Sequence, residues 1–369
     1  MPTSLKKLLG GSAARPIGSH VWFPDVDNSA VNPLYDTGSA VYLRSGNVLT
    51  DEETTYPEAF EKFGSLESNI EVWVPLVIYL SVIGFGNERF VGLSPSVAVY
   101  SDDSGETWGV SNTPVNGVWQ SIAFGNDAFV VTPYNSDISF YSLDNGETWT
   151  ASTLPFKGNW RGIAFGNGVF VTLAESTDKT AYSVDNGKTW TQANLPSSSN
   201  WSGIAFGNGV FVAVSYTSYQ AAYSYDNGQT WTLSSPLAAA PSSVAFGGGI
   251  FLALKQGRPF YFYSVDNGQT WTQEYFPSGT NNQWYKAVYA DGKFVVVLIN
   301  DERVLYSADA LTWGTAVTPS IYGYKDIVYG NNTFIAAQGN TSFRTLPSSL
   351  LGLPAEEIKD SAVKYMRIK

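Results

Sequence analysis

The side chains in this sequence with the most obvious chemical potential are aspartates that recur at a fixed spacing. Each lies in a segment of the form Ser-x-Asp-x-Gly-x-Thr-Trp, such as SVDNGKTW at residues 183–190. Paired carboxylates can serve as the acid and the base of a hydrolase, and carboxylates in one loop can bind calcium. An Asp side chain can also simply stabilise a turn by accepting backbone hydrogen bonds. The aspartates concerned are Asp103, Asp144, Asp185, Asp226, Asp266 and Asp309.

The spacing of these segments indicates what kind of fold must position them. The serines that open them follow one another at steps of 41, 41, 41, 40 and 43 residues. A second signature alternates with the first, as in IAFGNGVFV at residues 163–171 and again at 204–212. Asn-Gly and Asp-Gly turns are strong hairpin signals, so each unit reads as two hairpins and four strands. Repetition of such four-stranded units predicts an all-β fold, a β-propeller.

The two signatures occur in unequal numbers, which bears on the number of blades and on ring closure. The second has seven copies when weaker relatives are included, and the first has six. We predict a seven-bladed propeller, with six blades as the alternative. A strand at residues 69–76 is expected to supply the outer strand of the last blade and so close the ring. The predicted domains are an N-terminal module (1–65), the propeller (66–346) and a C-terminal extension (347–369).

The Ser-x-Asp-x-Gly-x-Thr-Trp segment resembles the Asp-box, the repeat of sialidase-like propellers and of several unrelated propeller families. Five copies match fully, and the sixth, SADALTW at residues 307–313, is one residue short and lacks the glycine. The resemblance is specific for the fold and says little about activity, because the same fold can carry many unrelated functional sites. We predict that the six aspartates are structural and accept hydrogen bonds from backbone N–H groups two and three residues further on. The glycine is expected at positive φ, and the tryptophan is expected to fold back over the hairpin.

Composition and charge exclude several other kinds of site. The 369 residues carry a formal net charge of −11, so a nucleic-acid backbone would be repelled. There is no cysteine and only one histidine, His20, which argues against a Ser–His–Asp triad and against thiolate or multi-histidine metal centres. No loop has the calcium-binding pattern with its distal glutamate, so we expect neither metal nor cofactor. The apolar run at 72–86 is too short to cross a bilayer, and no signal peptide is recognisable, so we expect no membrane insertion.

A binding site is expected on one particular face of the propeller. Both tight hairpins of every blade project at the face of the Asp boxes, here called the Asp-box face. The opposite, variable face carries loops that differ between blades, at residues 132–139, 173–180, 214–221, 255–262 and 299–304, and such loops commonly carry function. Aromatic residues that lead into the innermost strands form either a platform for sugar rings or packing at the channel mouth. The binding candidates are these aromatics and three arginines that depart from the repeat: Trp119, Trp160, Trp201, Trp284, Tyr285, Tyr324, Arg161, Arg258 and Arg303.

Catalysis remains an alternative, which the sequence does not favour. Sialidases hold their substrate with three arginines and use a tyrosine nucleophile helped by a glutamate, together with an acid/base aspartate. The three candidate arginines lie at different depths in their repeats, and the Arg-Ile-Pro element of sialidases is absent before the first box. Another glycoside hydrolase would need a pair of carboxylates, for which Glu175 with Asp301 or Glu302 are the candidates.

Over nearly its whole length, the amino-acid sequence resembles those of bacteriophage tail-fibre and other virion proteins. The resemblance rests on GSAVYLRSG (38–46) ahead of the propeller, on the repeated AFGNGVFV and YSxDNGxTWT phrases, and on VKYMRIK (363–369). It implies a virion protein, assembled in the host cytoplasm, that displays the propeller to a host-surface glycan or receptor. It also implies contacts with other virion tail proteins through residues 1–65, which could trimerise or dock singly. A structural or assembly-factor propeller, similar to photosystem II stability factors, is the remaining alternative.

Overall fold

The computed structural model describes residues 35–36, 41–42, 80–105, 107–111, 117–277, 284–298, 303–317, 324–338 and 342–347. Within these ranges all regular structure is β-strand. The chain divides into two compact units, residues 76–352 and residues 1–75 with 353–369. Of the second unit the structure describes the antiparallel pair β1 (Tyr35–Asp36) and β2 (Val41–Tyr42). The rest of the predicted N-terminal module, the predicted strand at 69–76 and residues 348–369 lie outside the described residues.

The described residues between 80 and 347 form a series of antiparallel sheets, each built from consecutive strands. The first three four-stranded sheets are β3 (Val82–Gly86), β4 (Arg89–Leu93), β5 (Ala98–Ser101) and β6 (Gly109–Val110); β7 (Trp119–Gly125), β8 (Ala128–Pro133), β9 (Ser136–Ser142) and β10 (Thr150–Gly158); and β11 (Trp160–Gly166), β12 (Val169–Ala174), β13 (Thr177–Ser183) and β14 (Thr191–Ser199). The next three are β15 (Trp201–Gly207), β16 (Val210–Ser215), β17 (Ala221–Ser224) and β18 (Thr232–Leu233); β19 (Ser243–Gly247), β20 (Ile250–Leu254), β21 (Phe260–Ser264) and β22 (Thr272–Tyr275); and β23 (Trp284–Ala290), β24 (Lys293–Leu298), β25 (Arg303–Ser307) and β26 (Gly314–Val317). A last sheet has three described strands, β27 (Tyr324–Gly330), β28 (Thr333–Gln338) and β29 (Ser342–Pro347).

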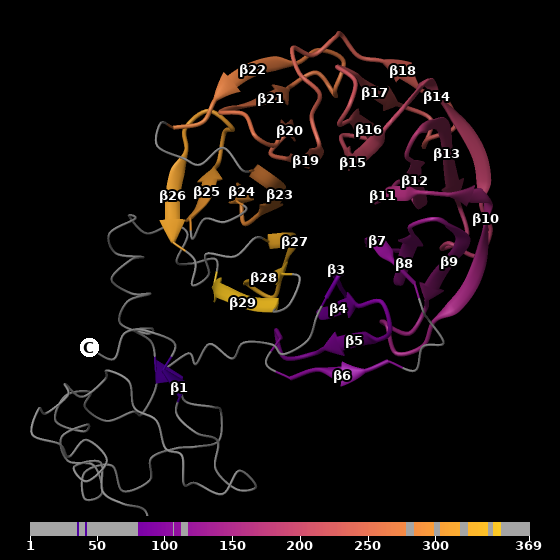
Figure 1. The fold of residues 1–369 in the computed structure, drawn as a ribbon, viewed down its shortest axis with the longest axis vertical. Helices are drawn as coiled ribbons and strands as arrows, with labels where there is room; N and C mark the ends of the chain where they lie inside the picture. The colour runs from indigo at the N-terminus through magenta and orange to yellow at the C-terminus, as the bar shows by residue number, and fades with distance from the viewer. Residues whose placement is uncertain are drawn as a thin grey trace, which may run out of the picture. The chain divides into compact units, whose positions relative to one another are not determined.

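The sheets are arranged as blades around a ring, which confirms the predicted all-β propeller (Figure 1). The first strand of every sheet lies nearest the centre and packs beside the first strand of the next sheet, from β3 through β27 and back to β3. Six of the sheets are four-stranded blades, which matches the six-blade alternative given above. The position between β23 and β3 is filled by the three-stranded sheet β27–β29, which completes the ring.

Local sequence explains why each blade forms its hairpins and buries its second strand. The turn between β11 and β12 has positive φ at both of its residues, 50° at Asn167 and 78° at Gly168, as a two-residue type I′ turn requires. Every residue of β12 is buried, because neighbouring strands flank it within its sheet and neighbouring blades cover both of its faces. β8 and β16 are buried in the same way, which accounts for their nearly continuous apolar sequences.

The repeated Ala-Phe-Gly sequence joins one blade to the next. Phe206 packs on Phe211 of its own blade, with ring centroids 4.7 Å apart, and also covers Gly166 of the preceding blade. A Cβ atom on Gly166 would lie 2.1 Å from the Phe206 ring, so only glycine permits this approach. The same contact between Gly330 and Phe85 joins the last sheet to the first and closes the ring.

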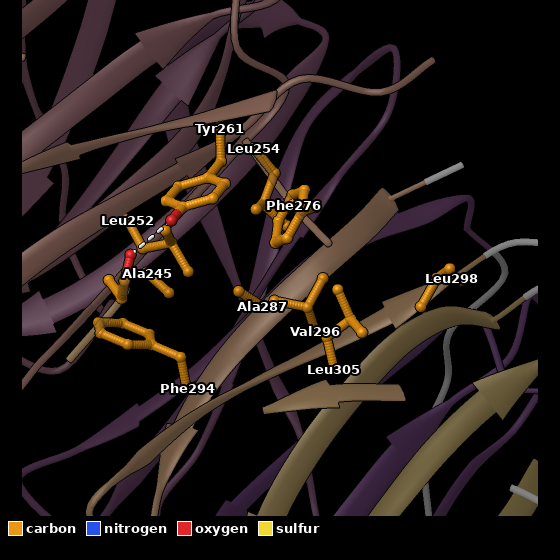
Figure 2. Packing of buried hydrophobic residues seen from close by; sticks show 11 residues of the cluster. Ala245, Leu252, Leu254, Tyr261, Phe276, Ala287, Phe294, Val296, Leu298 and Leu305 are labelled. Carbon is orange, nitrogen blue, oxygen red and sulfur yellow. Dashed lines mark hydrogen bonds between the residues drawn. The ribbon is translucent and has the colours of Figure 1, made fainter. Parts of the chain in front are cut away.

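The apolar core therefore lies between adjacent blades. Figure 2 shows the cluster shared by the fifth and sixth blades, where Tyr261 and Phe276 lie beside Leu254. The Tyr261 hydroxyl donates to the carbonyl oxygen of Ala310 at 2.7 Å and accepts from Trp313 Nε1 at 3.0 Å. Burial raises the pKa of Tyr261 to about 12, so this hydroxyl stays protonated and keeps its bond across the interface.

Candidate functional site

The Asp-box carboxylates are bound within their own turns. In the box at residues 183–190, Asp185 Oδ1 accepts from Ser183 Oγ at 2.8 Å and from Thr189 N at 2.9 Å. Its Oδ2 accepts from Thr189 Oγ1 at 2.6 Å, and Ser183 Oγ accepts from Gly187 N at 2.9 Å. The same four bonds recur around Asp103, Asp144, Asp226 and Asp266. Both oxygens of each carboxylate are thus engaged within the turn, which fits a structural role.

The hydrogen-bond pattern differs in one respect from the prediction. In the five regular boxes the backbone donor lies four residues after the aspartate, as Thr189 does after Asp185. The predicted donors, two and three residues further on, occur only at Asp309, which accepts from Leu311 N at 2.8 Å and Thr312 N at 2.7 Å. The cause is loop length, because the sixth box is one residue shorter and brings these two N–H groups within reach.

The turn also sets the ionisation of these aspartates. Partial burial alone would raise the pKa of Asp185, but the hydrogen bonds from Thr189 and Ser183 outweigh it and lower the pKa. The other four regular boxes behave alike. At Asp309 the N–H groups of Thr312 and Leu311 lower the pKa to about 2. Among the residues that the structure describes, no three Asp, Glu or His side chains are grouped so that they could hold a metal ion.

Asparagines extend this structural role across the Asp-box face. Asn167 Nδ2, in the inner turn of the third blade, donates to Asn227 Oδ1 in the Asp box of the fourth at 3.1 Å. Asn208 and Asn267 make the same contact one blade further on, also at 3.1 Å. The Asn-Gly and Asp-Asn-Gly sequences thus tie successive blades together on this face.

The tryptophans proposed as a sugar platform are buried. Trp119, Trp160 and Trp201 begin β7, β11 and β15, and their exposed fractions are 3%, 0% and 0%. Trp160 packs on Phe156, with ring centroids 4.7 Å apart, next to buried Leu154. These three rings cannot stack on a ligand in this structure. The alternative interpretation, packing beneath the loops, accounts for them.

For most of the remaining aromatic and arginine candidates, the structure describes the strand but not the side chain. Trp284, Tyr285, Arg303 and Tyr324 lie in β23, β25 and β27, and their side chains lie outside the described part, as do Asp301 and Glu302 entirely. Arg258 lies in the loop between β20 and β21, in the fifth blade, whereas Arg161 lies in β11 of the third.

Arg161 belongs to a compact polar cluster on the variable face. Its Nε donates to Glu175 Oε2 at 3.0 Å and its Nη2 donates to Glu175 Oε1 at 3.4 Å. The Tyr216 hydroxyl also donates to Glu175 Oε1. The Arg161 guanidinium lies 5.7 Å from the centroid of the Tyr216 ring. We call these three residues the Arg161–Glu175–Tyr216 cluster.

The repeat itself positions this cluster. Glu175 directly follows β12 and its backbone N–H donates to Asn159 O at 2.8 Å, in the connection that leads into β11. Tyr216 directly follows β16 and makes the equivalent bond to Asn200 O at 3.1 Å. Tyr134 occupies the same position after β8 in the second blade. Three successive blades therefore present Tyr, Glu and Tyr at one repeat position, 41 residues apart.

The electrostatics of the cluster do not suit Glu175 to acid catalysis. Burial alone would raise the pKa of Glu175, but the hydrogen bonds from Tyr216 and Arg161 and the arginine's charge lower it. The Glu175 side chain is 8% exposed and that of Arg161 is 38% exposed, so the carboxylate is covered while Arg161 and the exposed Tyr134 are open to solvent. A covered, ionised carboxylate is a poor general acid near neutral pH. Sequence reasoning named Arg161 and Glu175 separately and missed Tyr216, although the 41-residue step from Glu175 to Tyr216 was a usable signal.

Comparison with known proteins agrees with the repeats and the fold described above. Residues 140–151, 222–233 and 262–273 match the family model described as BNR/Asp-box repeat. The chain folds as a β-propeller and carries Asp-box repeats. No curated protein matches its sequence. No helix in the described part of the propeller chain is long and apolar enough to span a membrane.

Several solved structures share the propeller fold. One is YCF48 from Cyanidioschyzon merolae, at 12% identity and a TM-score of 0.58, over 75% of this chain and 99% of that one. YCF48 bound to D1 peptide matches at 15% identity and a TM-score of 0.60, over 76% and 96%. A streptogramin B lyase matches at 14% identity and a TM-score of 0.64, over 74% and 95%. Likeness at such low identity establishes the propeller fold alone.

Proposed function

We propose that this propeller is a non-catalytic recognition module of a bacteriophage particle that contacts a glycan on the host surface. The observation that carries the proposal is the Arg161–Glu175–Tyr216 cluster, with Tyr134 at the equivalent position of the adjacent blade, on the face whose loops vary between blades. Tyrosine rings beside hydrogen-bonding groups suit the alternation of apolar and hydroxyl surfaces on a sugar.

The virion context of the proposal is supported by the resemblance of the repeat sequences, and of residues 38–46 and 363–369, to bacteriophage tail proteins. In this proposal residues 1–65 join other virion tail proteins, as a trimer or singly, and the propeller is displayed outward to a host glycan or receptor. The ion pair of Glu175 with Arg161 argues against the alternative in which Glu175 acts as the acid of a glycoside hydrolase. A purely structural virion or assembly role makes no use of the exposed Tyr134.

The test is a glycan array probed with the labelled full chain and read both early and after long incubation. Stable binding is expected, and Tyr134→Ala should weaken it about tenfold, or about 1.4 kcal/mol. Tyr225→Ala is the matched control, because Tyr225 is similarly exposed, 56% against 40%, but lies in an Asp box on the opposite face. Spots that fade as products appear would indicate hydrolysis, and absence of any signal would contradict glycan recognition.

A further inference from the structure

We infer that the variable-face site selects uncharged saccharides and that Glu175 sets this selectivity. The inference rests on the proposed glycan-binding function and adds the charge class of the ligand. It assigns Glu175 a positioning role, in which the residue acts through Arg161 without touching the ligand.

The first argument is the occupation of the arginine. A guanidinium typically recognises a ligand carboxylate with two N–H groups that lie in one plane. In this cluster Nε and Nη2 of Arg161 are already bound to the two oxygens of Glu175, at 3.0 and 3.4 Å. The Nε/Nη2 edge of the guanidinium is therefore filled by a carboxylate of the protein itself, which also balances the charge of Arg161.

The second argument is that Glu175 cannot easily give way. Its side chain is almost fully covered, accepts from the Tyr216 hydroxyl, and begins at a backbone N–H bound to Asn159 O at 2.8 Å. A ligand carboxylate that displaced Glu175 would leave a buried, unpaired negative charge, which is strongly unfavourable. One that bound beside it would face like-charge repulsion at short range.

The groups left for a ligand suit hydroxyls. Arg161 is partly exposed and its Nη1 group is not bound to Glu175, so it can donate to a ligand, and Tyr134, which lies near enough to act on the charge of Arg161, is also exposed. Ser176, the residue after Glu175, is exposed and donates to Asn200 Oδ1 at 2.8 Å, so hydroxyl and amide groups border the cluster. Together with the neutral Arg161–Glu175 pair, these groups can exchange hydrogen bonds with a neutral sugar and offer no unpaired cation to an acidic one.

The experiment is an array of matched oligosaccharide pairs, each pair being the same chain with and without a terminal sialic acid, at 150 mM salt. The unmodified protein should bind the neutral member at least tenfold more tightly. Glu175→Gln keeps the size of the side chain and removes its charge, so affinity for the acidic member should rise about tenfold and become sensitive to salt. Asp178→Asn, near the start of β13 and three residues after Glu175, removes a charge that is not paired with Arg161 and should leave the preference unchanged.

The outcomes separate this inference from the function on which it rests. Binding of neither member by the unmodified protein would overturn the proposed glycan recognition and the inference with it. Binding with equal or greater affinity for the acidic members would overturn the inference alone, and this result needs no variant to fold. A folded Glu175→Gln protein, verified by its melting temperature, that kept the neutral preference would also overturn it.

Discussion

The glycine of each Asp box meets two requirements at once. Gly187 has φ at 81°, and a Cβ atom built on it would lie 2.9 Å from Val130 Cγ2 of the preceding blade. Gly209, in an inner hairpin turn, has a similar φ of 78° but nothing within 4 Å of its Cβ position. The first glycine is therefore required for backbone conformation and for contact between blades, and the second for conformation only.

This pair of glycines gives a matched test at the residue scale. Gly209→Ala should lower the free energy of unfolding by about 1–2 kcal/mol, the cost of the left-handed backbone. Gly187→Ala should cost about 1–3 kcal/mol more, because the added methyl group also collides with Val130 across the blade interface. Urea denaturation of both variants measures the difference. Equal losses in the free energy of unfolding would show that the interface around Val130 accommodates the added methyl group without destabilisation.

For single residues, the sequence predicted structural roles better than it predicted hydrogen-bond and packing partners. The fixed period was enough to assign the Asp-box residues to turns, because residue types and spacing define a local loop. It did not reveal that Thr189 supplies both a backbone and a side-chain donor, since that depends on the path of the loop. The sequence also did not decide whether Trp160 and Trp201 are buried or exposed. The repeat fixes the position of each tryptophan along its strand, but not which residues cover it.

At the scale of elements, the junction between β27 and β3 is where the ring closes. Asp326 in β27 is buried and accepts from Ile83 N of β3 at 3.2 Å. It also accepts from its neighbour Ile327 N at 2.9 Å and pairs with Lys286 of β23. One carboxylate thus touches three consecutive sheets. Its repeat position is occupied by Gly162 in the third blade, so the closing blades differ from the others here.

Removing the charge of Asp326 should weaken this junction specifically. Asp326→Asn is expected to lower the free energy of unfolding by about 1–3 kcal/mol, because the bonds to Ile83 and Lys286 involve a charged group. Amide hydrogen exchange should accelerate first in β3 and β27. Asp291→Asn, at an exposed turn, is the control and should change neither quantity. Uniform acceleration over all blades would mean that Asp326 does not act at the junction.

The sequence predicted the blades but not how the ring is joined. The repeat specifies the strands within a unit, so the hairpins and the sheet order followed from it. The repeat accounts for the Gly330–Phe85 contact between the first and last sheets, but not for the bond from Ile83 N to Asp326 or the pairing of Asp326 with Lys286 of β23, because Asp326 and Lys286 depart from the repeat. The predicted closing strand at 69–76 lies outside the described residues and stays a prediction.

At the scale of the whole molecule, the Asp boxes respond to pH together. The pKa of each box aspartate is lowered in the folded state, so each contributes stability that is present above its unfolded pKa and is lost as pH falls through its folded pKa. Glu175 adds a shift of the same sign. Because the boxes are spread over successive blades, acid weakens the Asp-box turns of several blades at once.

We therefore expect the propeller to lose stability steeply below about pH 4, where carboxylates begin to bind protons in the unfolded chain. Melting temperature followed by circular dichroism between pH 7 and pH 2 measures this. The temperature should change little above pH 5 and fall progressively below pH 4. A melting temperature that stayed constant down to pH 2 would contradict the role given to the box carboxylates.

The closing junction also bears on how the ring would respond to force. Every other pair of neighbouring blades is linked by the polypeptide itself, whereas within the described residues the first and last sheets meet through contacts such as Gly330 with Phe85 and Asp326 with Ile83. Both ends of residues 80–347 leave the ring from these two sheets. Tension applied through those ends is carried directly by this one junction, so the ring would rupture there first while the remaining blades kept their sheets.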